Sequence, residues 1–149
     1  MGRKFTDKDT LSYLLSIEEF TKKNHNKLMQ IMELRSVAES CTVSTDKESV
    51  QSSGSDKMSN IVGRIVDLER EIFETDKIIQ RRRAEFNEIT GKFPDDSQRE
   101  RDFLTLRYYD GNGFYDTVML MDLSNSTAKR IHKKGISEFT RLFNEKHYI

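Results

Sequence analysis

The sequence predicts an all-α protein: a long antiparallel two-helix hairpin of the coiled-coil type, followed by a C-terminal helix-turn-helix. Three observations support this prediction. An apolar pattern with alternating spacings of three and four continues for four heptads in residues 59–91, a polar stretch separates it from an earlier helical segment, and two further helical patterns meet at a short break near residue 123. Charged residues make up 34% of the 149 residues and proline occurs once, which favours long helices over a sheet.

The first long helix is expected within residues 1–41. Its heptad positions are occupied by Leu14, Ile17, Leu28, Ile31 and Ala38, with polar residues such as Asn24 between them. Met29, Met32 and Leu34 are expected to widen this stripe as core residues, which is the usual role of methionine in such a pattern.

Residues 42–58 differ in character from the helices on either side. They are rich in serine and threonine and contain few apolar side chains, so we expect a flexible loop. The second long helix is expected over residues 59–91, where one face carries Ile61, Ile65, Leu68, Ile72, Thr75, Ile79, Arg82, Phe86 and Ile89. Such a face needs a partner, which is either the first helix of the same chain in a hairpin or a second copy of the chain in a homodimer.

The run Arg81–Arg83 in the second helix has two interpretations. Three adjacent arginines can bind phosphate, but Asp76, Glu85 and Glu88 lie close to them in the helical register. The pattern favours a salt-bridged helix face over a nucleic-acid contact.

Residues 95–149 form the expected helix-turn-helix domain. Gly91 and Pro94 end the second long helix, and Ser97 with Glu100 is expected to form a capping box for the next helix. Asp95 and Asp96 fit the role of capping acids better than that of metal ligands.

This next helix should extend to about residue 109 and direct Phe103, Leu106 and Tyr109 toward the core. The segment Asp110–Gly113 then predicts a tight turn with two glycines that can adopt positive φ. It does not fit a calcium-binding loop, because the glycine and the bidentate acid that such a loop requires are missing.

The last helix should begin after Ser124, which can accept a hydrogen bond from the free amides of the first turn. Its inward stripe is formed by Ala128, Ile131, Gly135, Phe139 and Leu142. The small residues Ala128 and Gly135 are expected to let this helix pack closely against the one before it.

The outward face of the last helix is basic, since residues 124–137 contain four Lys or Arg and no Asp or Glu. Short polar residues at the helix start can reach base edges, and the basic residues that follow can contact phosphate or guanine. The expected contacts with double-stranded DNA are Asn125, Ser126, Thr127, Lys129, Arg130, Lys133 and Lys134. The alternative is a solvated basic face on an ordinary helical hairpin. His132 lies beside this face, either near phosphate or half-buried between helices.

Two sequence segments carry a resemblance to a known family. LRYYDG (106–111) and DLSNSTAKRIHKK (122–134) resemble region 4 of sigma-70-type factors, and more closely the small phage- and prophage-encoded ArpU/RinA-like regulators. The matching residues are Leu106, Arg107, Tyr108, Ser124, Arg130, Ile131, His132 and Lys134. The resemblance implies a DNA-binding transcriptional regulator of phage or prophage origin in the cytoplasm of a bacterial host, contacting DNA through Asn125, Ser126, Lys129, Arg130 and Lys133.

The chain departs from this pattern at the turn, where the family usually has glycine and this chain has Asp122. The first helix of the motif also has Asp116, Thr117 and Val118 in place of the usual acidic-Ile-Ala run. The negative charge of Asp122 near a phosphate path, and a net charge of zero, favour an alternative function. In that alternative the hairpin binds a host machine, such as RNA polymerase, and the helix-turn-helix does not bind DNA.

The sequence contains no pattern typical of an enzyme. A glycine-rich phosphate loop, a zinc-binding pattern and a nucleophile motif are all missing, so we expect no enzymatic activity, no catalytic residue, no cofactor and no metal site. The single cysteine, Cys41, is expected in a reducing cytoplasm. No apolar run approaches the length of a membrane span, so no membrane partner is expected.

Overall fold

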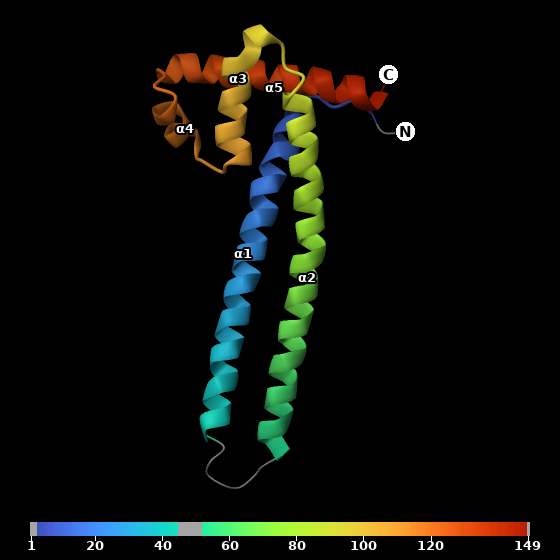
Figure 1. The fold of residues 1–149 in the computed structure, drawn as a ribbon, viewed down its shortest axis with the longest axis vertical. Helices are drawn as coiled ribbons and strands as arrows, with labels where there is room; N and C mark the ends of the chain where they lie inside the picture. Colours follow the sequence, from blue (N-terminus) through green and yellow to red (C-terminus); the bar gives the residue numbers. More distant parts are fainter. Residues whose placement is uncertain (1–2, 45–51, 149) are drawn as a thin grey trace. The chain divides into compact units, whose positions relative to one another are not determined.

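The structure is a computed structural model that describes residues 3–44 and 52–148, with side chains from 3–40 and 56–148. Every regular element in these ranges is helical. The elements are α1 (Asp7–Ser44), α2 (Ser52–Thr90), the 3₁₀ turn η1 (Asp95–Ser97), α3 (Gln98–Leu104), the π-helical turn η2 (Thr105–Tyr109), α4 (Phe114–Leu120) and α5 (Asn125–Tyr148). Figure 1 shows α1 and α2 side by side, with opposite directions. The predicted all-α class and the two-helix hairpin are confirmed.

Both long helices extend into the predicted 42–58 loop. Helix α1 continues to Ser44 and α2 starts at Ser52, so the loop prediction differs from the structure at both ends. The rest of that prediction, residues 45–51, lies outside the described residues. Adding a residue to an existing helix fixes few dihedrals for each new hydrogen bond, and serine and threonine cost less than about 1 kcal/mol each relative to alanine. A polar composition therefore does not by itself end a helix.

The chain divides into two compact units. Residues 1–19 and 80–149 form the terminal unit, and residues 20–79 form the hairpin unit. Each of the long helices contributes residues to both units, and the terminal unit is assembled from two separate stretches of sequence.

The hairpin unit is held by a narrow seam between α1 and α2. Ile31 of α1 and Leu68 of α2 are buried in it, and the Asn24 side-chain amide donates a hydrogen bond of 3.2 Å to the Ile72 carbonyl oxygen. Two cross-helix ion pairs flank the seam, Lys27 with Glu71 at 3.8 Å and Arg35 with Glu69 at 3.2 Å. The apolar face predicted for the second helix is confirmed, because all nine of its residues are buried or half-buried.

The prediction for the first helix is only partly confirmed. Its positions Leu14, Ile17 and Ile31 are buried, but Leu28 is 48% exposed. Met29 and Met32 are also exposed, so their assignment to the core is wrong. For the two methionines, the physical reason is that a two-helix hairpin covers only the heptad positions that face the partner helix, and Met29 and Met32 lie outside them.

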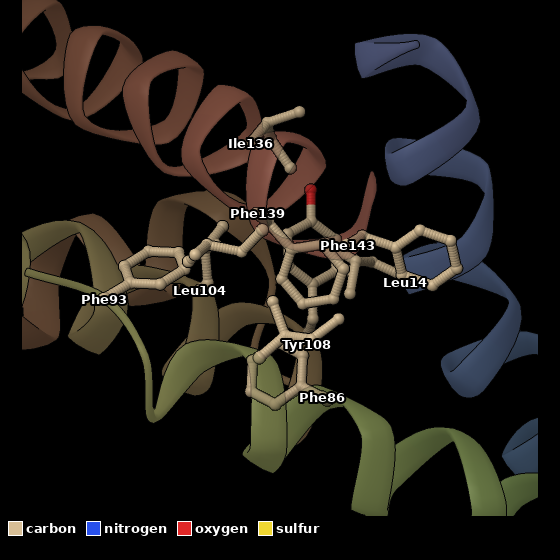
Figure 2. Packing of buried hydrophobic residues seen from close by; sticks show 10 residues of the cluster. Leu14, Phe86, Phe93, Leu104, Tyr108, Ile136, Phe139 and Phe143 are labelled. Carbon is tan, nitrogen blue, oxygen red and sulfur yellow. The ribbon is translucent and has the colours of Figure 1, made fainter. Parts of the chain in front are cut away.

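The terminal unit has a large aromatic core, part of which Figure 2 shows. Helices α1, α2, α3 and α5 and the turn η2 all contribute to it. Its buried members are Leu14, Phe86, Ile89, Phe93, Leu104, Tyr108, Ile136, Phe139, Leu142 and Phe143. Burial raises the pKa of the Tyr108 hydroxyl to about 12. One buried polar pair also lies inside the unit: the Thr10 and Thr140 hydroxyls lie 2.5 Å apart.

The N-terminal segment belongs to this unit. The Phe5 ring stacks on Phe143 with centroids 4.1 Å apart. The Phe5 amide donates to Asn144 Oδ1 at 2.8 Å, and Asn144 Nδ2 donates back to the Phe5 carbonyl at 3.0 Å. Helix α1 begins with a reciprocal cap between Thr6 and Asp9. The hydrogen bond from the Thr6 amide, together with the Arg3 guanidinium, lowers the pKa of Asp9.

The segment before α4 contains two corrections. The capping box of Ser97 and Glu100 does not form, because Ser97 makes no side-chain cap and the buried Glu100 pairs with Lys134. The fully buried positions are Phe103, Leu104 and Tyr108, whereas Leu106 is only half-buried. Tyr109 is half-buried and packs against the aromatic core, as predicted. A π-helical turn takes one residue more than an α-helical turn, so η2 moves the inward position along the chain.

The turn before α4 is tight, as predicted, but only one of its two glycines has positive φ. Gly111 has φ of 82°, whereas Gly113 has φ of −67° and lies at the start of α4. None of the helices in the described ranges has the length and apolarity that a membrane crossing requires.

Candidate nucleic-acid interface

Helices α4 and α5 and the turn between them form the candidate interface. A small apolar cluster joins α3, α4 and α5, with Phe103, Val118, Ala128 and Ile131 buried in it. Leu123, from the turn, packs against the same cluster. Thr117 is also buried, and its hydroxyl donates to the Gly113 carbonyl at 2.9 Å. Thr117 and Val118 are therefore both core residues.

The start of α5 has the predicted cap. Ser124 Oγ accepts a hydrogen bond from the Thr127 amide at 3.2 Å, and the Ser124 carbonyl accepts one from the Ala128 amide at 2.9 Å. The preceding Asp122 has φ of 53°, the left-handed conformation that glycine adopts most readily. Asp122 therefore occupies the conformation that a glycine would take in this turn, which aspartate tolerates better than most residues.

The inward stripe of α5 is confirmed, since all five of its predicted residues are buried. Gly135 allows the closest approach in this packing. A Cβ atom at this position would lie 3.2 Å from Leu104 Cγ and 3.4 Å from the Glu100 carbonyl oxygen. Gly135 therefore brings α5 close to α3 and not to α4, the helix directly before it, so the expected close packing occurs against a different helix.

The predicted contact residues divide into two groups. Six of the seven side chains are exposed, and five of these form one continuous stripe along the first turns of α5: Asn125, Ser126, Lys129, Arg130 and Lys133. The sixth exposed side chain, Lys134, and the half-buried Thr127 bind residues outside this stripe or at its start. The Thr127 hydroxyl accepts from Ser124 Oγ at 2.9 Å and from Arg130 Nη2 at 3.4 Å.

Lys134 is held by a buried carboxylate. Its Nζ lies 3.4 Å from Glu100 Oε1, and the Glu100 side chain is only 6% exposed. The other carboxylate oxygen of Glu100 has no hydrogen-bond partner among the described residues. Since a buried carboxylate without a cation is costly, Lys134 stabilises the packing of α5 on α3. Its charge is partly neutralised and contributes less than the others to the basic stripe.

His132 faces the interior of the protein. Its Nε2 lies 2.7 Å from the Tyr108 hydroxyl. The centroid of its ring lies 5.8 Å from the ring centroids of both Phe103 and Phe114. Burial, and to a smaller extent the charge of Arg107, lowers the pKa of His132. A neutral imidazole on the inner side of α5 is thus a packing residue, which agrees with the second interpretation given for it above.

Two arginines of the run in α2 contact aromatic rings and oxygen atoms of the terminal unit. Arg82 donates to the Ser16 hydroxyl and lies over the Tyr13 ring. Arg83 donates to the Tyr109 carbonyl at 3.0 Å and lies over its ring. Both side chains therefore connect helices within the terminal unit.

The acidic neighbours of this run hold the end of α5. Glu85 and Glu88 bind Lys146 at 2.6 and 2.7 Å, and Glu85 also contacts His147 at 2.7 Å. Burial alone would raise the pKa of Glu85, but the hydrogen bonds from Lys146 and His147 outweigh burial and lower it.

The sequence reasoning missed one feature of the candidate interface. Three large apolar side chains of α4 are exposed: Tyr115, Met119 and Leu120, with exposed fractions of 69%, 77% and 62%. The helical spacing contains the signal, because Phe114, Val118 and Met121 share the inward face. The residues between them must then point outward.

In fold and geometry this region is a helix-turn-helix with an exposed basic stripe on its second helix. No family model, curated protein or solved structure matches the chain. The comparisons therefore add nothing to the resemblance to sigma region 4, which depends on the sequence segments alone.

Proposed function

We propose that this protein is a sequence-specific DNA-binding transcriptional regulator of phage or prophage origin, with α5 as the recognition helix in the major groove. The observation that supports the proposal best is the exposed stripe of Asn125, Ser126, Lys129, Arg130 and Lys133. These residues lie on the first three turns of a helix whose N-terminus follows a short turn. This is the part of a helix-turn-helix that contacts base edges.

The local charge also favours this function. The chain has no net charge, so an attraction to DNA must come from a local surface. Residues 124–137 supply four cations and no carboxylate, and the free amides at the start of α5 add positive potential. Polar residues at the helix start would read bases, and the cations after them would bind phosphate or guanine.

The direct test is the salt dependence of DNA binding. Fluorescence anisotropy with a duplex from the region upstream of the gene would be measured at several salt concentrations. Replacing Lys129, Arg130 or Lys133 by alanine should weaken binding and reduce the slope of log K against log salt by about 0.9 for each lost phosphate contact. Lys92→Ala, at an exposed lysine outside α5, is the matched control. Unchanged slopes in all three variants would remove these residues from the interface.

Asp122 supplies a second test of the same interface. Asp122→Asn removes the negative charge but keeps a residue that tolerates φ of 53°. If α5 lies in the groove, this variant should bind DNA more tightly than the wild type, and the difference should decrease as salt increases. Equal affinities at low salt would place Asp122 far from any phosphate.

The competing function is an interaction protein that binds a host machine, such as RNA polymerase, without touching DNA. The exposed apolar side chains Tyr115, Met119 and Leu120 favour a protein partner for α4. The two functions differ in what the protein binds and in the effect of Met119→Ser. A regulator that needs only DNA binds the duplex, and Met119→Ser leaves this affinity unchanged. An interaction protein does not bind the duplex, and Met119→Ser weakens its binding to the protein partner.

A further inference from the structure

The hairpin unit exposes more of its large apolar side chains than it buries. Among its described residues, four are buried: Ile31, Ile61, Leu68 and Ile79. Seven others are exposed: Leu28, Met29, Met32, Val37, Val62, Val66 and Phe73. A protein surface in water rarely leaves this much apolar area together without a use for it.

Most of these exposed residues share one side of the hairpin. Taking Leu14 as position a of its heptad and Ile61 as position d, Met32 and Val62 are at e, while Met29, Val66 and Phe73 are at b. In an antiparallel pair, the e positions of both helices flank the seam on one side and the g positions flank it on the other, and each b position lies beside an e position. The ion pair of Lys27 and Glu71, both at g, marks the g side. The exposed residues therefore gather on the opposite side, the e flank.

The cross-helix bonds also fix which residues of the e flank lie at the same level. Lys27 faces Glu71, and Asn24 bonds to the Ile72 carbonyl. In this register Met32 lies opposite Val66. The e flank is thus an apolar surface made by both helices, defined here by Met29, Met32, Val62, Val66 and Phe73.

Two residues limit this apolar surface. The nearly half-exposed Leu28 lies at its edge. Glu69, at position e, interrupts it on α2, and Arg35 pairs with this carboxylate at 3.2 Å. The ion pair partly neutralises the one acidic side chain that lies between Val66 and Phe73 on the e flank.

We infer that the e flank is the docking surface for a second copy of this chain, which would form a four-helix bundle with the first. A two-fold axis between the copies would bury both apolar surfaces against each other. This inference does not depend on DNA binding. It assigns a surface to the dimer that the sequence left open.

The pattern along α1 is complementary to itself when reversed. The b and e positions read Lys22, His25, Met29, Met32, Ser36 and Glu39. If the second copy lies antiparallel, Met29 meets Met32 of its partner and Lys22 meets Glu39. Each of these contacts occurs twice, as two-fold symmetry requires.

The pattern along α2 has the same centre. Reversal about the level between Asp67 and Leu68 brings Val62 opposite Phe73 and Val66 opposite Glu69 of the second copy. In the hairpin register this is also the level midway between Met29 and Met32. A parallel arrangement would keep one apolar contact, Met32 against Val66, but it would place Met29 against Glu69 and Val62 against Ser36. The antiparallel arrangement pairs more of the apolar side chains with one another and is therefore favoured.

The test is the mass of the full chain in solution without DNA, measured by sedimentation equilibrium. The wild type should have twice the mass of one chain at micromolar concentration. Met29→Glu with Met32→Glu should weaken dimerisation at least about 100-fold, because charges would be buried in the interface. Gln30→Glu introduces the same residue between these positions but on another side of α1, and it should leave the dimer intact.

Both methionines are exposed, so the double variant should keep the helical content of the wild type, as checked by circular dichroism. Phe73→Glu, on the other helix, should weaken the dimer independently. A monomeric wild type would overturn the inference, and so would a dimer that survives both sets of substitutions. Neither result would affect the proposed DNA interface, which is tested on α5.

The antiparallel arrangement has its own test. Lys22→Glu and Glu39→Lys should each weaken dimerisation about threefold to tenfold, the usual range for rim charges, and the double variant should restore it. If both single variants weaken the dimer and the double variant does not restore it, the antiparallel arrangement is wrong.

Discussion

The two units of this chain bury their large apolar side chains to very different extents. The terminal unit encloses ten buried residues in one cluster that includes Phe86, Phe139 and Phe143. The hairpin unit buries a single narrow seam and leaves Met32 and Phe73 more than half exposed. The difference shows that two packed helices cannot enclose an apolar core by themselves, whereas four helices packed around a common centre can. The terminal unit buries most of its large apolar side chains within one chain, whereas the hairpin unit leaves several of them exposed.

The largest effect should come from emptying the core of the terminal unit. Phe139 is fully buried, so Phe139→Ala should lower the free energy of unfolding by about 3–5 kcal/mol. Leu28→Ala in the hairpin unit should cost less than about 1 kcal/mol, because Leu28 is 48% exposed. Urea denaturation of both variants, at a protein concentration well below that expected for the proposed dimer, measures the contrast. Similar losses would mean that the two units are equally well packed.

A glycine in each unit provides a matched pair with effects of opposite sign. A Cβ atom at Gly63 would meet nothing within 4 Å among the described residues beyond its own helical turn, so Gly63→Ala should stabilise α2 by about 0.5–1 kcal/mol. Gly135→Ala would force a methyl group against Leu104 and should destabilise the protein by about 1 kcal/mol. Thermal unfolding of the two variants decides the signs. Stabilisation by both would show that Leu104 moves aside easily.

The turn of the candidate interface should show a smaller difference. Asp122→Ala places a side chain without local hydrogen-bonding groups at φ of 53° and should cost about 1 kcal/mol. Asp122→Gly removes the steric cost and should leave stability nearly unchanged. The comparison requires only thermal unfolding at neutral pH. Equal stabilities would show that the turn relaxes to another conformation when the side chain changes.

The smallest effect should be a pH dependence that arises in the terminal unit. The pKa of His132 is lower in the folded protein than in the unfolded chain, so the unfolded chain binds more protons as the pH falls. The stability contributed by the neutral imidazole is complete above the unfolded pKa of about 6.5 and decreases as the pH falls through that value toward the folded pKa. His132→Gln should therefore lose less stability than the wild type between pH 7.5 and pH 5.5 in urea titrations. Parallel losses would assign the pH dependence to other groups.

Local patterns in the sequence predicted the helices and the inward stripe of α5 correctly. Ser124 caps the helix through an amide three residues away, and residues such as Ile131 and Phe139 recur at helical spacing. Such features depend on neighbours in sequence, so periodicity and capping chemistry are sufficient to find them.

The errors occurred where distant residues decide the outcome. Glu100 was expected to cap its own helix, but Lys134 binds it from α5. Met32 was expected in the core, but the number of helices around it is set by tertiary structure. The π-helical turn that moves Tyr108 inward has no local signature in the sequence. For the candidate site, the sequence predicted the exposed basic stripe, but it did not separate Lys134 from Lys133.

The bonds between Phe5 and Asn144 have a consequence for the order in which the chain folds. The hairpin unit is continuous in sequence, so its helices can pair while the ribosome is still adding later residues. The terminal unit joins residues 139 positions apart, so it stays open until Asn144 has been synthesised. During that interval, nascent chains on neighbouring ribosomes would carry folded hairpins whose C-terminal segments are not yet fully synthesised.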